Sequence, residues 1–146
     1  KDFFQDNGAS PTVLAPEEMV AAILIPREAV SARTSFIKIA MRKGIDFSIG
    51  SIAGFFAQND KGAGELRLVL NCIGSAPINL KKTVQVIAEA GFTDAAVERA
   101  ALTARSELGA LTNLFTSAGY KRHLAEVLVK RALNELNELS GKNRSK

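Results

Sequence analysis

The sequence has very few residues of the kinds that bind metals or form disulfides. Its 146 residues include one cysteine, Cys72, one histidine, His123, and no tryptophan. One cysteine excludes an internal disulfide, and one cysteine with one histidine cannot supply the ligands of a structural zinc site. A Ser-His-Asp triad is not supported either, because the chain has no Gly-x-Ser-x-Gly turn. We therefore expect no catalytic residue and no metal site, with Cys72 as a small buried side chain and His123 as a solvated one.

Long apolar runs and clustered glycines are also missing. Every apolar stretch is shorter than the roughly 20 residues that a membrane-spanning helix needs, and no targeting segment is present. We therefore expect no membrane span and a cytoplasmic location. The 11 glycines are scattered, so the chain lacks the glycine-rich turn whose backbone N–H groups bind a pyrophosphate. The first residue is Lys1 rather than methionine, and we expect a fragment or a processed piece of a longer protein.

An excess of positive charge is present, but it is modest. Lysine and arginine number 19 against 15 acidic residues, which gives a net charge of +4. Three of the basic residues, Lys142, Arg144 and Lys146, lie in a tail that we expect to be solvated. The chain has no helix-turn-helix pattern and no basic stripe interleaved with aromatics, so we expect no nucleic-acid partner. A non-catalytic basic α+β interaction module that binds RNA or a protein partner stays open as the alternative.

Residues 36–56 are the stretch around which the chain is organised. The pattern predicts a strand at residues 35–41 and a second, almost wholly apolar strand at residues 45–56. The tight loop near their junction holds Arg42, Lys43 and Asp46. Gly50 and Gly54 indicate a bulge or the close approach of a neighbouring element. A buried helix remains the alternative for residues 45–56, because alanine, glycine and isoleucine do not decide between the two.

Lys38 stands out within the first strand because it lies among apolar residues. Alternation places it on the same face as Phe36 and Ala40. Burying an ammonium group without a partner costs several kcal/mol. We therefore expect Lys38 either to reach the edge of the sheet or to meet an anion or a polar ring.

The residues before this stretch predict three short segments. Residues 1–15 form a lead-in segment, and Pro16 followed by Glu17 and Glu18 predicts a helix through residue 22. Residues 23–25 predict a brief strand that Pro26 ends. Val20 on that helix is a core residue by periodicity alone.

The residues after it change from period two to period 3.6. A hairpin at residues 58–64 leads into a third strand at residues 65–73, whose apolar face is Leu66, Leu68, Leu70 and Cys72. Helices follow at residues 79–90, from the cap Thr93 to Gly109, and at residues 117–139. Their inward faces are Leu80, Val84 and Ile87; Val97, Ala100, Ala104 and Leu108; and Tyr120, Leu124, Val127, Leu128, Ala132 and Leu136.

The predicted fold class is α+β: a two-layer sandwich in which a roughly three-stranded antiparallel sheet packs against three C-terminal helices. We expect one domain over residues 1–146, with residues 16–74 mainly strands, 75–139 helices and 140–146 a tail.

Several segments, taken in order, resemble a known family. They are Phe3 and Phe4; residues 12–18; Ile23 to Pro26 in the order Ile-Leu-Ile-Pro; Phe36, Ile37 and Lys38 with Arg42 and Asp46; residues 72–77; residues 117–122; and Arg131, Ala132 and Leu133. Their order and spacing resemble the C-terminal domain of the FAD-binding (medium, or flavoprotein) subunit of molybdenum hydroxylases, the xanthine dehydrogenase and carbon monoxide dehydrogenase group. Gly44 and Ile45 stand where animal-type xanthine dehydrogenases carry acidic residues beside the flavin ring.

The resemblance implies a role in an oxidoreductase that contains FAD, 2Fe-2S centres and molybdopterin. It implies that a preceding N-terminal domain binds most of the FAD and that this domain closes over it. The 2Fe-2S and molybdopterin groups would lie on an iron–sulfur subunit and a molybdenum subunit. Five positions correspond to the neighbourhood of the flavin: Val20, Lys38, Arg42, Lys43 and Asp46.

Overall fold

The structure, a computed structural model, describes residues 3–5, 7–58, 64–109, 112 and 116–142. The elements, in chain order, are the 3₁₀ helix η1 Arg27–Ser31, the strands β1 Arg33–Ala40, β2 Ser48–Gln58, β3 Gly64–Asn71 and β4 Ile78–Asn79, and the helices α1 Lys81–Ala90, α2 Asp94–Glu107 and α3 Ala118–Lys142. The α+β fold class is therefore confirmed. A short fourth strand, β4, adds to the three strands that the sequence predicted.

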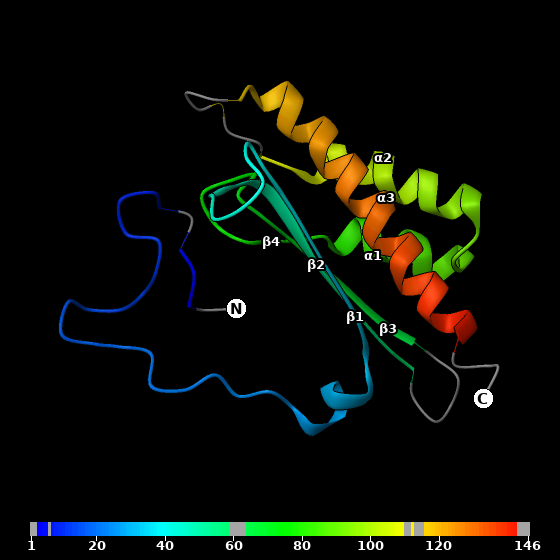
Figure 1. The fold of residues 1–146 in the computed structure, drawn as a ribbon, viewed down its shortest axis with the longest axis horizontal. Coiled ribbons are helices and arrows are strands. Elements are labelled where there is room, and N and C mark those ends of the chain that lie inside the picture. The colour runs from blue at the N-terminus through cyan, green and yellow to red at the C-terminus, as the bar shows by residue number, and fades with distance from the viewer. Residues whose placement is uncertain (1–2, 6, 59–63, 110–111, 113–115, 143–146) are drawn as a thin grey trace.

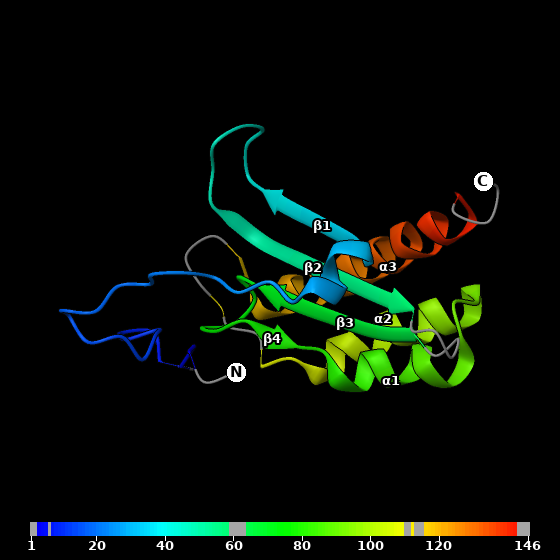
Figure 2. The same cartoon turned by 90° about the horizontal axis from the view of Figure 1, so that it is seen from below.

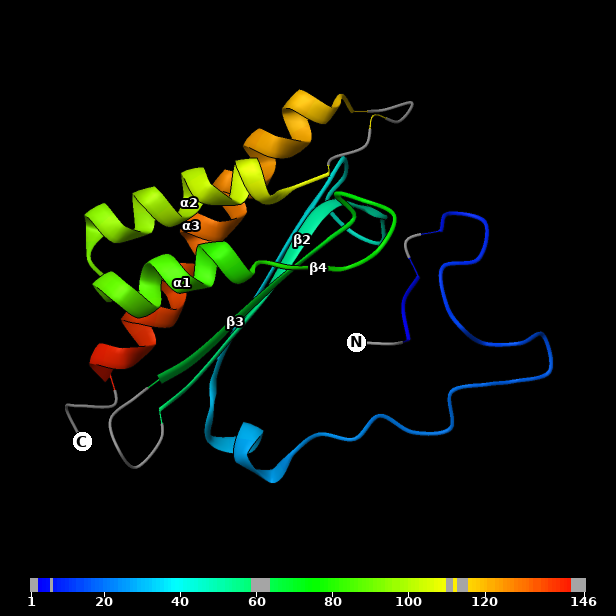
Figure 3. The ribbon, with the colours of Figure 1, turned by 180° about the vertical axis from the view of Figure 1, so that it is seen from behind.

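The four strands form one antiparallel sheet in the order β1-β2-β3-β4. The connecting residues 59–63 of the predicted hairpin lie outside the described residues, but Gln58 pairs with Gly64, as two strands joined by a hairpin do. All three helices lie on one side of this sheet, and α3 runs diagonally across β1 and β2 (Figure 1). From behind, α1 is seen beside β3, with α2 packed against α1 and α3 (Figure 3).

The register of the strands fixes which side chains face the helices. Ile37, Ile52 and Leu70 are cross-strand partners, and Ile52 and Leu70 are completely buried. Gly50 and Gly54 face the same way, because a Cβ built on them would lie 2.9 Å from Leu124 and 3.0 Å from Leu136 of α3. The two glycines therefore allow the close approach of a neighbouring element that the sequence indicated.

The helices begin and end as their capping residues dictate. The Thr93 side chain accepts a hydrogen bond from the Ala96 N–H, and Gly91 ends α1 with a φ of +69°. The predicted inward face of α2 is buried throughout. On α3, Leu124, Leu128, Ala132 and Leu136 are buried, but Tyr120 is 46% exposed and was wrongly assigned to the stripe.

Three further predictions are wrong. Residues 16–22 form no helix and residues 23–25 form no strand; residues 16 and 17 form a turn, and all of residues 16–25 are exposed. A seven-residue helix is stable only when its apolar face packs against something, and this segment packs against nothing described. Cys72 is half-buried rather than buried, because β3 ends at Asn71 and Cys72 turns with a φ of +65°, which leaves Ile73 to fill the core.

No helix in the described part of the chain is long and apolar enough to cross a membrane.

Candidate functional site on the open face of the sheet

The face of the sheet opposite the helices carries an unusual mixture of basic, aromatic and small side chains. We call it the open face. Phe36 on this face is 69% exposed, and Arg67 lies over the ring of Phe55 at 5.8 Å from its centroid. By register and alternation, the open face consists of Thr34, Phe36 and Lys38 of β1, Ser51, Ala53 and Phe55 of β2, and Arg67, Val69 and Asn71 of β3.

Lys38 is on this face, beside Phe36 as the alternation predicted. Its side chain is exposed rather than buried, and its ammonium Nζ donates a hydrogen bond to the backbone oxygen of Asp46 at 2.7 Å. The premise that Lys38 is buried is therefore wrong, because no helix in the described part of the chain covers this face. The ammonium group is held in place by a neutral carbonyl, which leaves its charge available to an anionic or polar group.

The loop of residues 41–47, which we call the Lys38 loop, is organised by Asp46. Arg42 Nε donates to Asp46 Oδ2 at 3.3 Å, and the Phe47 N–H donates to Asp46 Oδ1 at 2.9 Å. The hydrogen bond from Arg42 is the main cause that lowers the pKa of Asp46, with smaller contributions from the Phe47 N–H and the charge of Lys38. Arg42 and Lys43 together outnumber this one carboxylate, so the loop carries a net positive charge.

A cleft of about 690 Å³ adjoins the Lys38 loop. Its lining residues are Met41, Arg42, Asp46, Phe47, Ser48, Ile49 and Thr116. The loop projects beyond the ends of the strands it joins (Figure 2), and its apolar side chains are strongly exposed: Met41 67%, Ile45 107% and Phe47 94%. A surface of this kind, apolar with a few polar groups at its edge, is typical of a site that another molecule or domain covers.

The structure brings together some of the predicted site residues but not all of them. Lys38, Arg42 and Asp46 make direct contacts, and Lys43 lies exposed in the same loop. Val20 is 50% exposed, in an extended segment that Figures 1 and 2 place well away from this loop.

Sequence reasoning missed the exposure of Met41 and Phe47. The sequence placed Phe47 in the strand predicted at residues 45–56, but β2 begins at Ser48, so Phe47 lies in the loop. An apolar residue in an apolar run is read as core by default, and only the uncovered face shows otherwise.

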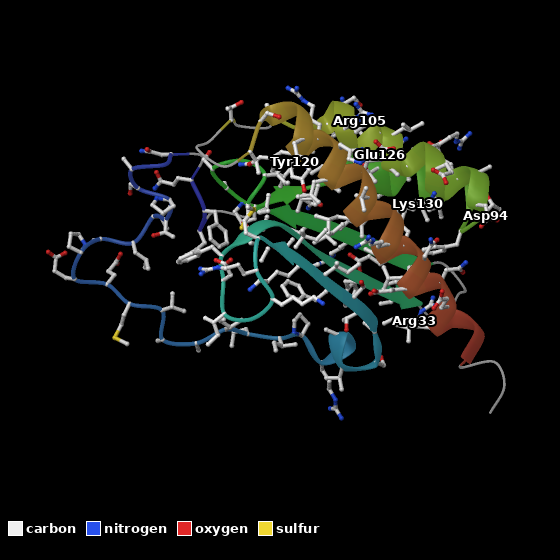
Figure 4. The ribbon with its side chains drawn as sticks, turned by 45° about the horizontal axis from the view of Figure 1, so that its top comes forward. Arg33, Asp94, Arg105, Tyr120, Glu126 and Lys130 are labelled. Carbon is white, nitrogen blue, oxygen red and sulfur yellow. The ribbon has the colours of Figure 1, made fainter. Side chains whose placement is uncertain are left out.

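A second polar cluster joins α2 to α3 and is structural. Arg105 donates to Glu126 at 3.1 Å (Figure 4). Lys130 donates a hydrogen bond to Glu98, and this bond raises the pKa of Lys130. These groups are mostly exposed and hold neighbouring helices together. His123 is largely solvated beside Glu126, as predicted. Within the described ranges, no group of three or more histidine, cysteine or acidic side chains could hold a metal ion.

Comparison with known proteins gives one family and a set of similar folds. Residues 35–136 match the CO dehydrogenase flavoprotein C-terminal domain. Reconstituted CO dehydrogenase from Oligotropha carboxidovorans aligns with a TM-score of 0.76 and 20% identity, over 92% of this chain and 46% of that one. CO dehydrogenase from Hydrogenophaga pseudoflava, in a form that lacks the Mo-pyranopterin moiety of its cofactor, aligns with a TM-score of 0.64 and 24% identity, over 74% and 37%.

Quinoline 2-oxidoreductase from Pseudomonas putida 86 aligns with a TM-score of 0.64 and 16% identity, over 74% of this chain and 38% of that one. No curated protein sequence matches the chain. At these identities the solved structures establish a shared fold. This chain spans less than half the length of each of them.

Proposed function

Because this chain belongs to the CO dehydrogenase flavoprotein C-terminal domain family, we propose that it closes over FAD in the flavoprotein subunit of a molybdenum hydroxylase. When bound, FAD supplies electron transfer between 2Fe-2S centres and an external acceptor, and substrate is oxidised at molybdopterin on a partner subunit. The part of this chain is to position and shield the flavin. No residue of the chain is assigned a proton-transfer step.

The observation that carries the proposal is the Lys38 ammonium group, which stands on the open face of the sheet and bonds the carbonyl of Asp46, a residue that lines the cleft. Lys38 is fixed by the Asp46 carbonyl, and Arg42 lies on the other side of Asp46. Two cations at the rim of an apolar surface suit a planar, electron-rich ring whose polar edge accepts hydrogen bonds. The chain has no glycine-rich pyrophosphate loop, so we assign the phosphates of FAD to the preceding domain.

The test is the flavin affinity of the subunit in which this chain is joined to its flavin-binding domain. Lys38→Met keeps the length of the side chain and removes the charge. A hydrogen bond to a charged group contributes about 1.5–3 kcal/mol, so we expect affinity for FAD to fall roughly ten- to a hundredfold. Flavin content and reductive titration measure the loss.

Lys81→Met, on the exposed surface of α1, is the matched control and should bind FAD as the wild type does. Unchanged affinity and potential in Lys38→Met would remove this residue from the site.

One observation favours the alternative function, an interaction module that binds RNA. The open face presents Phe36 together with Lys38 and Arg67, and a basic sheet face with an exposed aromatic ring can stack bases. Binding of single-stranded RNA that weakens steeply with salt would support the alternative. The flavin proposal predicts no such binding.

A further inference from the structure

Asp46 makes two kinds of contact, one through its backbone and one through its side chain. Its backbone oxygen accepts the hydrogen bond from the Lys38 ammonium group at 2.7 Å. Its carboxylate accepts hydrogen bonds from Arg42 Nε at 3.3 Å and from the Phe47 N–H at 2.9 Å. The side chain of Asp46 is 15% exposed, whereas that of Arg42 is 80% exposed. The Asp46 carboxylate therefore presents little surface to a ligand, and its oxygens bond its own loop.

The peptide group between Asp46 and Phe47 connects these contacts. In a planar trans peptide the carbonyl and the N–H point in opposite directions, and no described peptide bond is cis. The N–H of this peptide group donates to Asp46 Oδ1, and its carbonyl oxygen accepts from Lys38. The hydrogen bond that fixes the N–H therefore also fixes the direction of the carbonyl. Arg42 bonds the second carboxylate oxygen and so holds the carboxylate in the orientation that the Phe47 N–H requires.

The Lys38 side chain gains a fixed position from this arrangement. It is exposed on the open face, where a lysine side chain ordinarily samples many rotamers. An ammonium group has three donors, so the bond to the Asp46 carbonyl leaves two of them for a ligand. A charged group that is already in place does not have to be ordered when the ligand binds. Loss of the fixed position should therefore weaken binding without removing any contact to the ligand.

We infer that Asp46 is a positioning residue, whose carboxylate fixes the peptide group that holds Lys38, and that it acts on the flavin through Lys38 rather than by touching it. The inference rests on the proposed function, which supplies the flavin as the ligand of Lys38. It gives Asp46 a role different from that of Lys38, although the family resemblance placed both residues near the flavin.

The first measurement is the FAD affinity of the subunit in which this chain is joined to its flavin-binding domain. Asp46→Ala removes the carboxylate and should lower the affinity about tenfold, which corresponds to ordering one lysine side chain on binding. Asp46→Asn keeps an oxygen that accepts from the Phe47 N–H, so its affinity should stay within about threefold of the wild type. Glu89→Ala, which removes an exposed carboxylate from α1, is the control and should bind FAD normally.

A double variant shows whether Asp46 acts through Lys38. In the Lys38→Met background, Asp46→Ala should cause no further loss of FAD affinity, because no ammonium group remains to be positioned. If the two losses add, Asp46 acts on the flavin independently and the inference is wrong. Equal losses in Asp46→Asn and Asp46→Ala would also overturn it, because the charge of the carboxylate and not the Phe47 hydrogen bond would then matter.

NMR relaxation of the Lys38 side chain in residues 1–146 supplies the second measurement, which needs no flavin. The methylene group next to the ammonium should be restricted in the wild type and in Asp46→Asn, and mobile in Asp46→Ala. Lys81, exposed on α1, should be mobile in all three proteins. A restricted Lys38 in Asp46→Ala would overturn the inference.

The two measurements separate this inference from the proposed function. Unchanged FAD affinity in Lys38→Met would refute the flavin role of Lys38, and the NMR measurement would still decide whether Asp46 positions it. An affinity that falls in Lys38→Met but not in Asp46→Ala would refute the inference and leave the proposed function standing.

Discussion

The two faces of the same sheet differ as much as the inside and outside of a protein, although they are made by alternate residues of the same strands. On the helix side, Ile52, Leu68 and Leu70 are completely buried. On the open face, Phe36 is 69% exposed on a strand whose next residue, Ile37, packs against the core. The helix side is covered by this chain's own helices. The open face carries apolar side chains that nothing in the described chain covers, as is expected of a surface that binds a partner.

The largest expected effect comes from shortening one side chain on each face. Leu70→Ala should destabilise the chain by about 2–5 kcal/mol, because it removes buried methyl groups and leaves a cavity beneath the helices. Phe36→Ala removes a larger side chain from the open face and should cost about 0.5 kcal/mol or less. Urea melts of both variants measure the difference. If the two costs were equal, the open face would be covered within residues 1–146.

The helix layer contributes a second comparison, between two glutamates. Glu107 accepts hydrogen bonds from the Lys82 N–H at 2.9 Å, the Thr83 N–H at 3.1 Å and the Thr83 hydroxyl at 2.9 Å. It therefore caps the first turn of α1 from the end of α2, and Thr83 is completely buried.

Glu107→Ala leaves the Thr83 hydroxyl without its acceptor and should cost about 1–3 kcal/mol. Glu89→Ala is the control, because Glu89 is exposed on α1 and bonds only Gln85 within the described chain, so its loss should cost less than about 0.5 kcal/mol. Thermal melts compare the two. A loss in Glu107→Ala no larger than in Glu89→Ala would mean that water replaces the interhelical cap without penalty.

The sequence predicted the fold where local and long-range signals agreed. The alternation of Leu66, Leu68 and Leu70 identified the buried face of β3, and Thr93 and Gly91 marked helix ends correctly, because capping and alternation are properties of neighbouring residues. The missing information was whether each face is covered. The apolar run at residues 19–25 was interpreted as helix and strand because its pattern requires cover, and the sequence does not say that the described chain leaves it exposed.

The sequence likewise predicted some features of the candidate site and not others. Alternation placed Lys38 beside Phe36, and the spacing of Arg42 and Asp46 suggested one loop; the structure brings Lys38, Arg42 and Asp46 into contact. The hydrogen bond from Lys38 to the Asp46 carbonyl could not be predicted, because it depends on the path of the loop between β1 and β2. The cofactor-facing assignments of all five residues, Val20, Lys38, Arg42, Lys43 and Asp46, stay predictions.

The smallest expected effect is a pH dependence confined to the open side of the molecule. The pKa of Asp46 is lowered, chiefly by the hydrogen bond from Arg42. A carboxyl whose folded pKa lies below its unfolded value of about 3.9 stabilises the folded loop above that value, and the contribution is lost as pH falls through the folded pKa. The Phe47 amide, which donates to Asp46 Oδ1, should therefore keep its NMR chemical shift from neutral pH to about pH 4 and move only below it. Amides on the helix side, such as the Thr93-capped Ala96, should not follow this titration.

Arg42→Gln should raise the midpoint of the Phe47 titration toward the ordinary aspartate pKa, and Asp46→Asn should abolish the transition. A Phe47 titration unchanged in Arg42→Gln would show that the guanidinium group does not hold the carboxylate. The Lys38 loop would then owe its shape to the backbone contacts of Asp46, and Arg42 would be free to meet a ligand.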